Sequence, residues 1–149
     1  SGTENLANVV GFAAAVENQS FEMKSGMQSA ICEKRDYLES MIKEVSKSTI
    51  IVGETVNRLP NTSYFLTPGW KNDLQVACLD LKGFSISSGM ACSSGKPNKG
   101  GTLISMGYTR ELSECGVRVS IGPTTTRLDL ERFVEVWSEQ LLSWQSIAA

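Results

Sequence analysis

The spacing of the apolar residues changes twice along the chain, and this limits the folds that are open to it. Apolar residues recur every three or four positions from Leu6 to about Glu17, and again over a longer stretch that ends at Val45. From Thr49 they fall in short β-branched and aromatic runs, and helical spacing returns only after Thr126. The sequence therefore predicts two helices, a strand-rich middle and a closing helix.

The second helix is expected to be the longer of the first two, with a stripe of methionine and aliphatic residues along one side. Its members are Met23, Met27, Ala30, Ile31, Leu38, Met41, Ile42 and Val45. Methionine fills irregular gaps in cores and also serves adaptable interfaces. We favour core packing over a partner-binding surface for this stripe.

The middle of the chain contains four short runs that predict strands, over residues 49–52, 62–67, 84–87 and 117–121. A short helix before the third run should be capped by Asn72 or Asp73 and end at Gly83. Two further helical turns, ended by Gly107 and Gly116, should precede the last strand. Helices packed on a small mixed or antiparallel sheet give an α+β fold, which we expect to span residues 1–149 as one domain.

The last strand alternates cleanly between two kinds of side chain. Val117, Val119 and Ile121 should face the core together, because neighbouring side chains point to opposite faces of a strand. Arg118 and Ser120 must then share the other face.

The closing helix has the clearest pattern in the chain. Its start, from Thr126 to Asp129, matches a capping box with aspartate in the acidic position. The apolar stripe that follows consists of Leu130, Phe133, Val134, Trp137, Leu141 and Trp144.

Composition excludes several classes of function. The formal charge of −2 and the scattered basic residues argue against a nucleic-acid partner. The chain has no histidine, which excludes a Cys-His protease or a Ser-His-Asp hydrolase within it. Its cysteines form no CxxC pair and, without histidine, no metal site of the usual zinc spacing. No signal peptide or membrane span is evident, so we expect a reducing, cytoplasmic location without disulfides.

One of the four cysteines, Cys92, lies in a run of small residues that predicts a loop after the third strand. Small neighbours leave its sulfur accessible, and Lys96 and Lys99 can bring positive charge that favours the reactive thiolate. Free cysteine is also among the most buried residue types, so a buried structural cysteine is the alternative. The loop chemistry alone leaves both interpretations open.

Five segments together resemble the pyridoxal-phosphate-dependent cysteine desulfurases, in the branch with the longer cysteine loop. They are Ser1–Asn5, Arg58–Thr62, Ser87–Gly95, Leu103–Gly107 and Val117–Gly122, and they lie in the order and at about the intervals of that family. The resemblance implies the smaller, carboxy-terminal domain of a fold-type I enzyme, together with the helix that connects it to the large domain. It also implies that the lysine holding pyridoxal phosphate belongs to the large domain, which is absent from this chain.

The same resemblance implies a role for three residues. Cys92 resembles the nucleophile that takes sulfur from L-cysteine as a persulfide, with release of alanine, for a sulfur acceptor or an iron–sulfur scaffold protein. Arg118 resembles the arginine that binds the substrate α-carboxylate, a planar anion that suits the guanidinium fork. Thr3 resembles the threonine that reaches the cofactor phosphate of the neighbouring subunit in a homodimer. Without the resemblance, Arg118 would be a solvated arginine and Thr3 a helix cap.

The sequence departs from the family pattern and leaves other functions open. Met90 stands where a small polar residue is usual, and Pro123 stands where an arginine is common. One alternative is a stand-alone persulfide carrier or interaction module without the cofactor. Another is the small domain of a different fold-type I enzyme, which the complete cysteine motif argues against. As a fragment of a desulfurase, the isolated chain should show no turnover.

Overall fold

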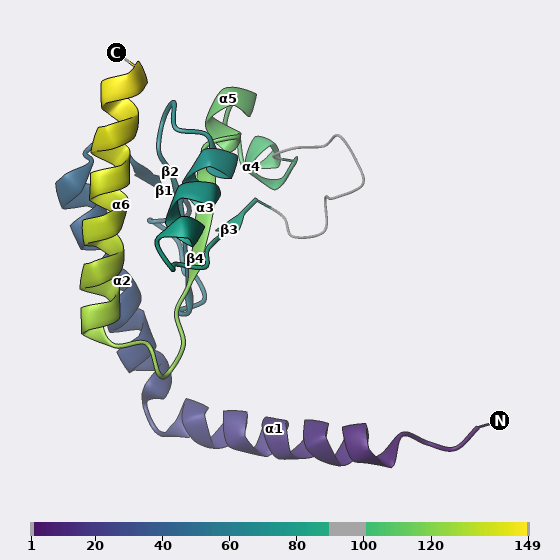
Figure 1. Cartoon of the computed structure of the whole chain (residues 1–149). Coiled ribbons are helices and arrows are strands. Elements are labelled where there is room, and N and C mark those ends of the chain that lie inside the picture. Colours follow the sequence, from purple (N-terminus) through teal and green to yellow (C-terminus); the bar gives the residue numbers. More distant parts are fainter. Residues whose placement is uncertain (1, 90–100, 149) are drawn as a thin grey trace.

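The computed structural model describes residues 2–89 and 101–148 (Figure 1). The helices are α1 (Leu6–Lys24), α2 (Met27–Val45), α3 (Asn72–Leu81), α4 (Gly101–Ser105), α5 (Arg110–Ser113) and α6 (Arg127–Ala148). The strands are β1 (Ile50–Ile51), β2 (Thr62–Leu66), β3 (Ser87–Ser88) and β4 (Gly116–Ser120). This is the predicted order of elements, and the α+β fold is confirmed.

The four strands form one antiparallel sheet in the order β1-β2-β4-β3. In this register Tyr64 of β2 lies opposite Arg118 of β4. On the other side of β4, Ser87 of β3 also lies opposite Arg118. The sheet therefore places Arg118 of β4 between β2 and β3, which both lie well before β4 in the sequence.

One face of the sheet is covered by helices and holds the main core. Val117, Val119 and Ile121 are all buried there, as the alternation of β4 predicts. Helices α2, α3 and α6 supply the other side of this core. At its centre the fully buried ring of Trp137 meets Phe65 of β2 edge to face, with 5.7 Å between ring centroids.

The opposite face of the sheet is only partly covered. At one end, Leu66 of β2 packs with Leu103 of α4 in a small second cluster, which Tyr64, Tyr108 and Leu112 flank. The remaining side chains of β2 and β4 on this face are half-buried or exposed. We call this side, outlined by Thr62, Tyr64, Arg118 and Ser120, the open face.

The first two helices divide later than the sequence predicts. The polar residues after Glu17 do not end α1, where the hydroxyl of Ser20 donates to the carbonyl oxygen of Val16 at 2.9 Å. The break comes instead at Gly26, whose φ of 81° is readily adopted only by glycine. Met23 therefore belongs to α1 and not to the stripe of α2. Most of the remaining stripe packs as expected, with Ile31, Leu38 and Ile42 in the core and Met27 and Met41 against it. Ala30 and Val45 are exposed instead, so their predicted core packing is wrong.

Two further boundaries also differ from their predictions. The cap position of α3 is Lys71, because the N–H of Asn72 donates to the carbonyl oxygen of Glu114 in a tertiary contact at 2.8 Å. The third strand is shorter than expected. The N–H of Phe84 still donates to the carbonyl oxygen of Leu79 in α3, and the chain pairs with β4 only from Ser87. By contrast, the capping box at Thr126 is confirmed by its reciprocal bonds with Asp129.

Helix α1 projects away from the sheet and its covering helices (Figure 1). Every residue of α1 whose burial is described is exposed, including six large apolar side chains. These are Leu6, Val9, Val10, Phe12, Val16 and Phe21. None of the described helices is both long and apolar enough to cross a lipid bilayer.

Candidate functional site

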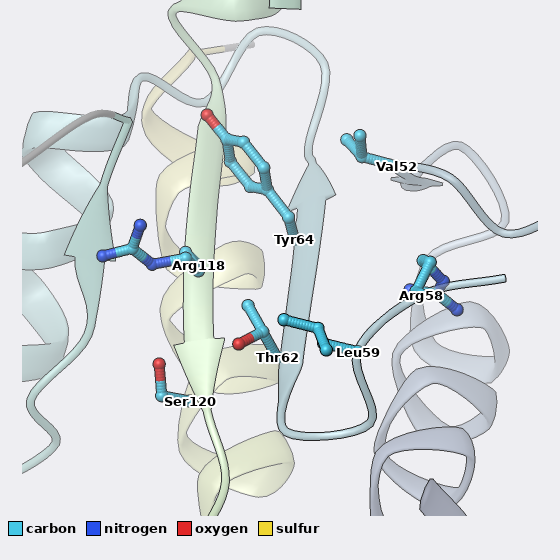
Figure 2. Close-up of a pocket in the computed structure, with 7 residues that line it drawn as sticks. All are labelled: Val52, Arg58, Leu59, Thr62, Tyr64, Arg118 and Ser120. Carbon is cyan, nitrogen blue, oxygen red and sulfur yellow. The ribbon is translucent and has the colours of Figure 1, made fainter. Parts of the chain in front are cut away.

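A hollow of about 420 Å³ lies on the open face of the sheet (Figure 2). Its lining comes from β2, β4, the residue that follows β1 and the loop before β2. The residues are Val52, Arg58, Leu59, Thr62, Tyr64, Arg118 and Ser120. Its floor is built by strand alternation, since Thr62 pairs with Ser120 and Tyr64 with Arg118 on the same side of the sheet.

Arg118 is the main charged group that β4 presents to this hollow. Its side chain is half-buried on the face away from the core, as the alternation of β4 predicts. Within residues 2–89 and 101–148, its guanidinium makes no hydrogen bond and no ion pair. A half-desolvated guanidinium without a partner is suited to binding an anion, and its fork matches a carboxylate.

Tyr64 forms the wall of the hollow nearest to α4 and α5. Its ring lies so close to Gly116 of β4 that a Cβ atom there would be 2.9 Å from the ring carbon Cε2. Burial raises the pKa of the Tyr64 phenol, and the neighbouring charge of Arg118 partly opposes that rise. The hydroxyl is therefore neutral at neutral pH and able to donate.

The opposite wall is the loop before β2, which α2 holds in place. Arg58 makes two hydrogen bonds of 2.8 Å to the two carboxylate oxygens of Glu39 on α2. The hydrogen bond to Glu39 is the main reason that the pKa of Arg58 is raised, so Arg58 stays charged. Arg35 of α2 also donates to the carbonyl oxygen of Leu59 at 3.1 Å. These contacts occupy Arg58 and leave Arg118 as the guanidinium free to receive an anion in the described part of the hollow.

Asn61, at the end of this loop, makes a backbone contact with the end of β4. Its carbonyl oxygen accepts a 2.8 Å hydrogen bond from the N–H of Ile121, which joins the start of β2 to the end of β4.

The other two predicted site residues lie apart from the hollow. Cys92 is outside the described residues, and its role stays a prediction. Thr3 is exposed ahead of α1, and it is the side chain of Asn5 that caps this helix by accepting from the N–H of Asn8 at 3.3 Å. The alternative that Thr3 is the helix cap is therefore wrong.

Sequence reasoning missed Tyr64, Leu59 and Thr62 as individual members of the site. The alternation of residues 62–67 would have placed Thr62 and Tyr64 on one face. It could not show that this face lies beside Arg118, because the strand register joins residues more than fifty positions apart. Among the described residues, no cluster of His, Cys, Asp or Glu side chains is arranged to hold a metal ion.

Comparison with protein families and with known proteins finds relatives of this chain. The family model described as aminotransferase class-V matches residues 1–133. A protein named cysteine desulfurase IscS from Dictyoglomus turgidum is 30% identical over 136 residues, which are 91% of this chain and 34% of that protein. Cysteine desulfurase NifS from Azotobacter vinelandii is 28% identical over 134 residues, 90% of this chain and 33% of that protein.

Solved structures show the same fold. A NifS-like protein from Rickettsia africae superposes with a TM-score of 0.81 at 28% identity, covering 93% of this chain and 35% of that one. A second NifS-like protein, at 24% identity, also gives a TM-score of 0.81. The chain spans about a third of the length of the relatives that it matches.

Proposed function

The chain belongs to the aminotransferase class-V family, and from this we propose that it is the carboxy-terminal part of a pyridoxal-phosphate-dependent cysteine desulfurase. In that enzyme it would bind L-cysteine and supply the thiol that takes the substrate's sulfur. The observation that carries the proposal is the guanidinium of Arg118, half-buried in the hollow without a partner among the described residues. The names of the relatives supply the substrate.

Arg118 would hold the α-carboxylate of L-cysteine. Two parallel N–H···O bonds fix both the position and the plane of a carboxylate, which a single ammonium group cannot do. The hollow of about 420 Å³ is within the size range of small-molecule sites. The hydroxyls of Thr62 and Ser120 on its floor offer further polar contacts to an amino acid.

The described residues fit one part of the cofactor complex and not the whole. Arg118 suits the substrate carboxylate, and Thr3 offers an exposed hydroxyl near the positive end of the α1 dipole, where a phosphate would be favoured. No lysine lines the hollow in the described part of the chain. The cofactor lysine would therefore come from the large domain, and Thr3 would act towards the neighbouring subunit of a homodimer.

Cys92 would be the nucleophile. Strand β3 runs beside Arg118, and Cys92 follows the end of this strand by four positions in the sequence. The Cys92 thiolate forms an S–S bond with the substrate sulfur while the substrate C–S bond breaks, and the electron pair passes to the carbon side. Pyridoxal phosphate, when bound, supplies the electron withdrawal that accepts this pair. Protonation of that carbon then gives alanine.

The product on the protein would be a persulfide on Cys92. A sulfur acceptor or an iron–sulfur scaffold protein would consume it, because a persulfide is a stored sulfur atom that a second thiolate can remove. The chain alone should not turn over, since it would accept a persulfide without being able to make one.

Intact mass spectrometry tests the proposal. The purified chain is mixed with L-cysteine, pyridoxal phosphate and a catalytic amount of a complete desulfurase, and its mass is measured with and without reductant. We expect a reducible gain of one sulfur atom only when the complete desulfurase is present, and no gain in Cys92→Ala. A Cys92 that stays unmodified under every condition would contradict the proposal.

A second experiment tests Arg118 in the complete enzyme. Arg118→Ala should weaken L-cysteine binding by about 2 kcal/mol or more, because a charge-assisted bidentate contact is lost. The absorbance of the bound cofactor should remain. Equal loss of substrate and cofactor binding would instead indicate a structural role for Arg118.

A further inference from the structure

Two polar side chains start from paired positions on the open face, and neither has a partner among the described residues. The guanidinium of Arg118 and the hydroxyl of Tyr64 make no hydrogen bond within the described part of the chain. Both side chains are half-buried and line the same hollow, from directly opposed positions on β4 and β2. Leaving two such groups unpaired is unfavourable unless water or a ligand satisfies both.

The chain is built to bring the Tyr64 hydroxyl over β4. Figure 2 shows the ring reaching from β2 across to the strand that carries Arg118. Gly116 provides the space, because a Cβ at this position would lie 3.1 Å from the Tyr64 hydroxyl and 2.8 Å from Leu66 Cδ2. Tyr64 also packs against the cluster of Val52, Leu66 and Leu103.

The two groups are complementary as ligands for one anion. A carboxylate has about four lone-pair positions, and a bidentate guanidinium uses only the two that face it. A neutral phenol has one O–H to donate, and burial keeps Tyr64 neutral. The charge of Arg118 acts on the Tyr64 phenol and partly opposes the rise of its pKa.

We propose that Tyr64 is a second substrate-binding residue, whose hydroxyl donates a hydrogen bond to the carboxylate held by Arg118. The identity of that carboxylate as the one of L-cysteine rests on the proposed function. The hydrogen bond itself requires only an anion of that shape. Tyr64 thereby contributes to selection of a free carboxylate over a neutral ester or amide at this position.

The first test uses the complete enzyme with two substrates, L-cysteine and its methyl ester. Tyr64→Phe removes the hydroxyl and keeps the ring over Gly116. We expect the ratio of kcat/KM for L-cysteine to that for the ester to fall by about tenfold or more, since a hydrogen bond to a charged group is lost. A purely structural role would lower both values together and leave the ratio unchanged.

Tyr108→Phe is the matched control, because Tyr108 is also a half-buried tyrosine that packs against the same small cluster, yet it does not line the hollow. The ratio should stay at the wild-type value in this variant. An unchanged ratio in Tyr64→Phe, or an equal fall in Tyr108→Phe, would overturn the inference. If Arg118→Ala lowers the ratio while Tyr64→Phe does not, the inference fails and the role of Arg118 stands.

The second test uses the chain itself and does not depend on desulfurase activity. Sodium acetate is titrated into the isotope-labelled chain, with neutral acetamide as the control, while the Arg118 Nε and Tyr64 Cζ resonances are followed by NMR. We expect acetate to shift both resonances with one common midpoint and Tyr64→Phe to raise that midpoint about tenfold. A shift at Arg118 alone, with an unchanged midpoint in Tyr64→Phe, would overturn the inference even if the complete enzyme is a desulfurase.

Discussion

The two faces of the sheet differ in how completely this chain covers them with packed side chains. On the covered face, β4 buries Val117 and Val119 against α2, α3 and α6, and aromatic rings fill the centre. On the open face, the same strand presents Arg118 to a hollow in which the described residues offer it no partner. One strand of five residues thus contributes to a packed core on one face and to a partly exposed hollow on the other. The contrast between the two faces separates residues that stabilise the fold from residues that are available to bind a ligand.

The largest loss of stability is expected from removing the indole ring at the centre of the core on the covered face. Trp137→Ala should lower the free energy of unfolding by about 3–5 kcal/mol, because the fully buried ring leaves a cavity beside Phe65 and Trp70. Urea denaturation followed by circular dichroism measures this loss. Arg118→Ala, from the other face of the sheet, should change it by no more than about 0.5 kcal/mol. A similar loss of stability in both variants would contradict the view that the covered face stabilises the fold and that Arg118 on the open face does not.

The second-largest loss of stability is expected at Gly116, where β4 lies in close contact with Tyr64 on the open face. Gly116→Ala should cost about 1–3 kcal/mol, because the new methyl group overlaps the side chains of Tyr64 and Leu66. Gly122→Ala is the matched control, since no heavy atom lies within 4 Å of a Cβ at that position. Equal stability of the two alanine variants would mean that Tyr64 does not need the space over Gly116.

Local patterns explain which parts of this contrast could be predicted. The alternation of β4 assigns Val117 and Arg118 to opposite faces because side-chain direction in a strand depends only on the parity of the position. The capping box at Thr126 is equally local, since its donors and acceptors lie within three residues. Both predictions are confirmed.

The features that could not be predicted depend on contacts between distant residues. The start of α3 shifts to Lys71 because a carbonyl oxygen about forty residues away, on Glu114, receives the N–H of Asn72. Tyr64 joins the site through strand register, which sequence periodicity does not encode. Cys92 lies outside the described residues, so its place in the site remains a prediction that rests on family resemblance.

The third prediction concerns the start of α6, the longest helix over the covered face. Thr126→Ala should cost about 1 kcal/mol at neutral pH, because the hydroxyl that accepts from the N–H of Asp129 is lost. Thermal unfolding measures the change. Ser138→Ala is a suitable control, since its hydroxyl bonds only to a carbonyl oxygen within α6 and should have a smaller effect.

Acid should reduce the difference in stability between the wild type and Thr126→Ala. Hydrogen bonds from Thr126 lower the pKa of Asp129 below its ordinary value in the folded protein. The stability that they contribute is therefore present above the ordinary aspartate pKa and is lost as the pH falls through the lowered value. The gap between wild type and Thr126→Ala should narrow in acid, and a gap that is constant across this range would argue against a reciprocal box.

The smallest effect is expected at α1, a helix whose described apolar side chains are exposed to solvent, as the side chains of the open face are in part. Phe12 and Phe133 both lie at apolar positions of long helices, yet Phe12 is 73% exposed and Phe133 only 4%. Phe133→Ala should cost about 3–5 kcal/mol because the ring packs edge to face on Phe84. Phe12→Ala should change the free energy of unfolding by less than about 0.5 kcal/mol, because its ring leaves no cavity behind. Comparable losses at both positions would show that α1 packs against this chain in solution, and periodicity would then predict burial as well as helix formation.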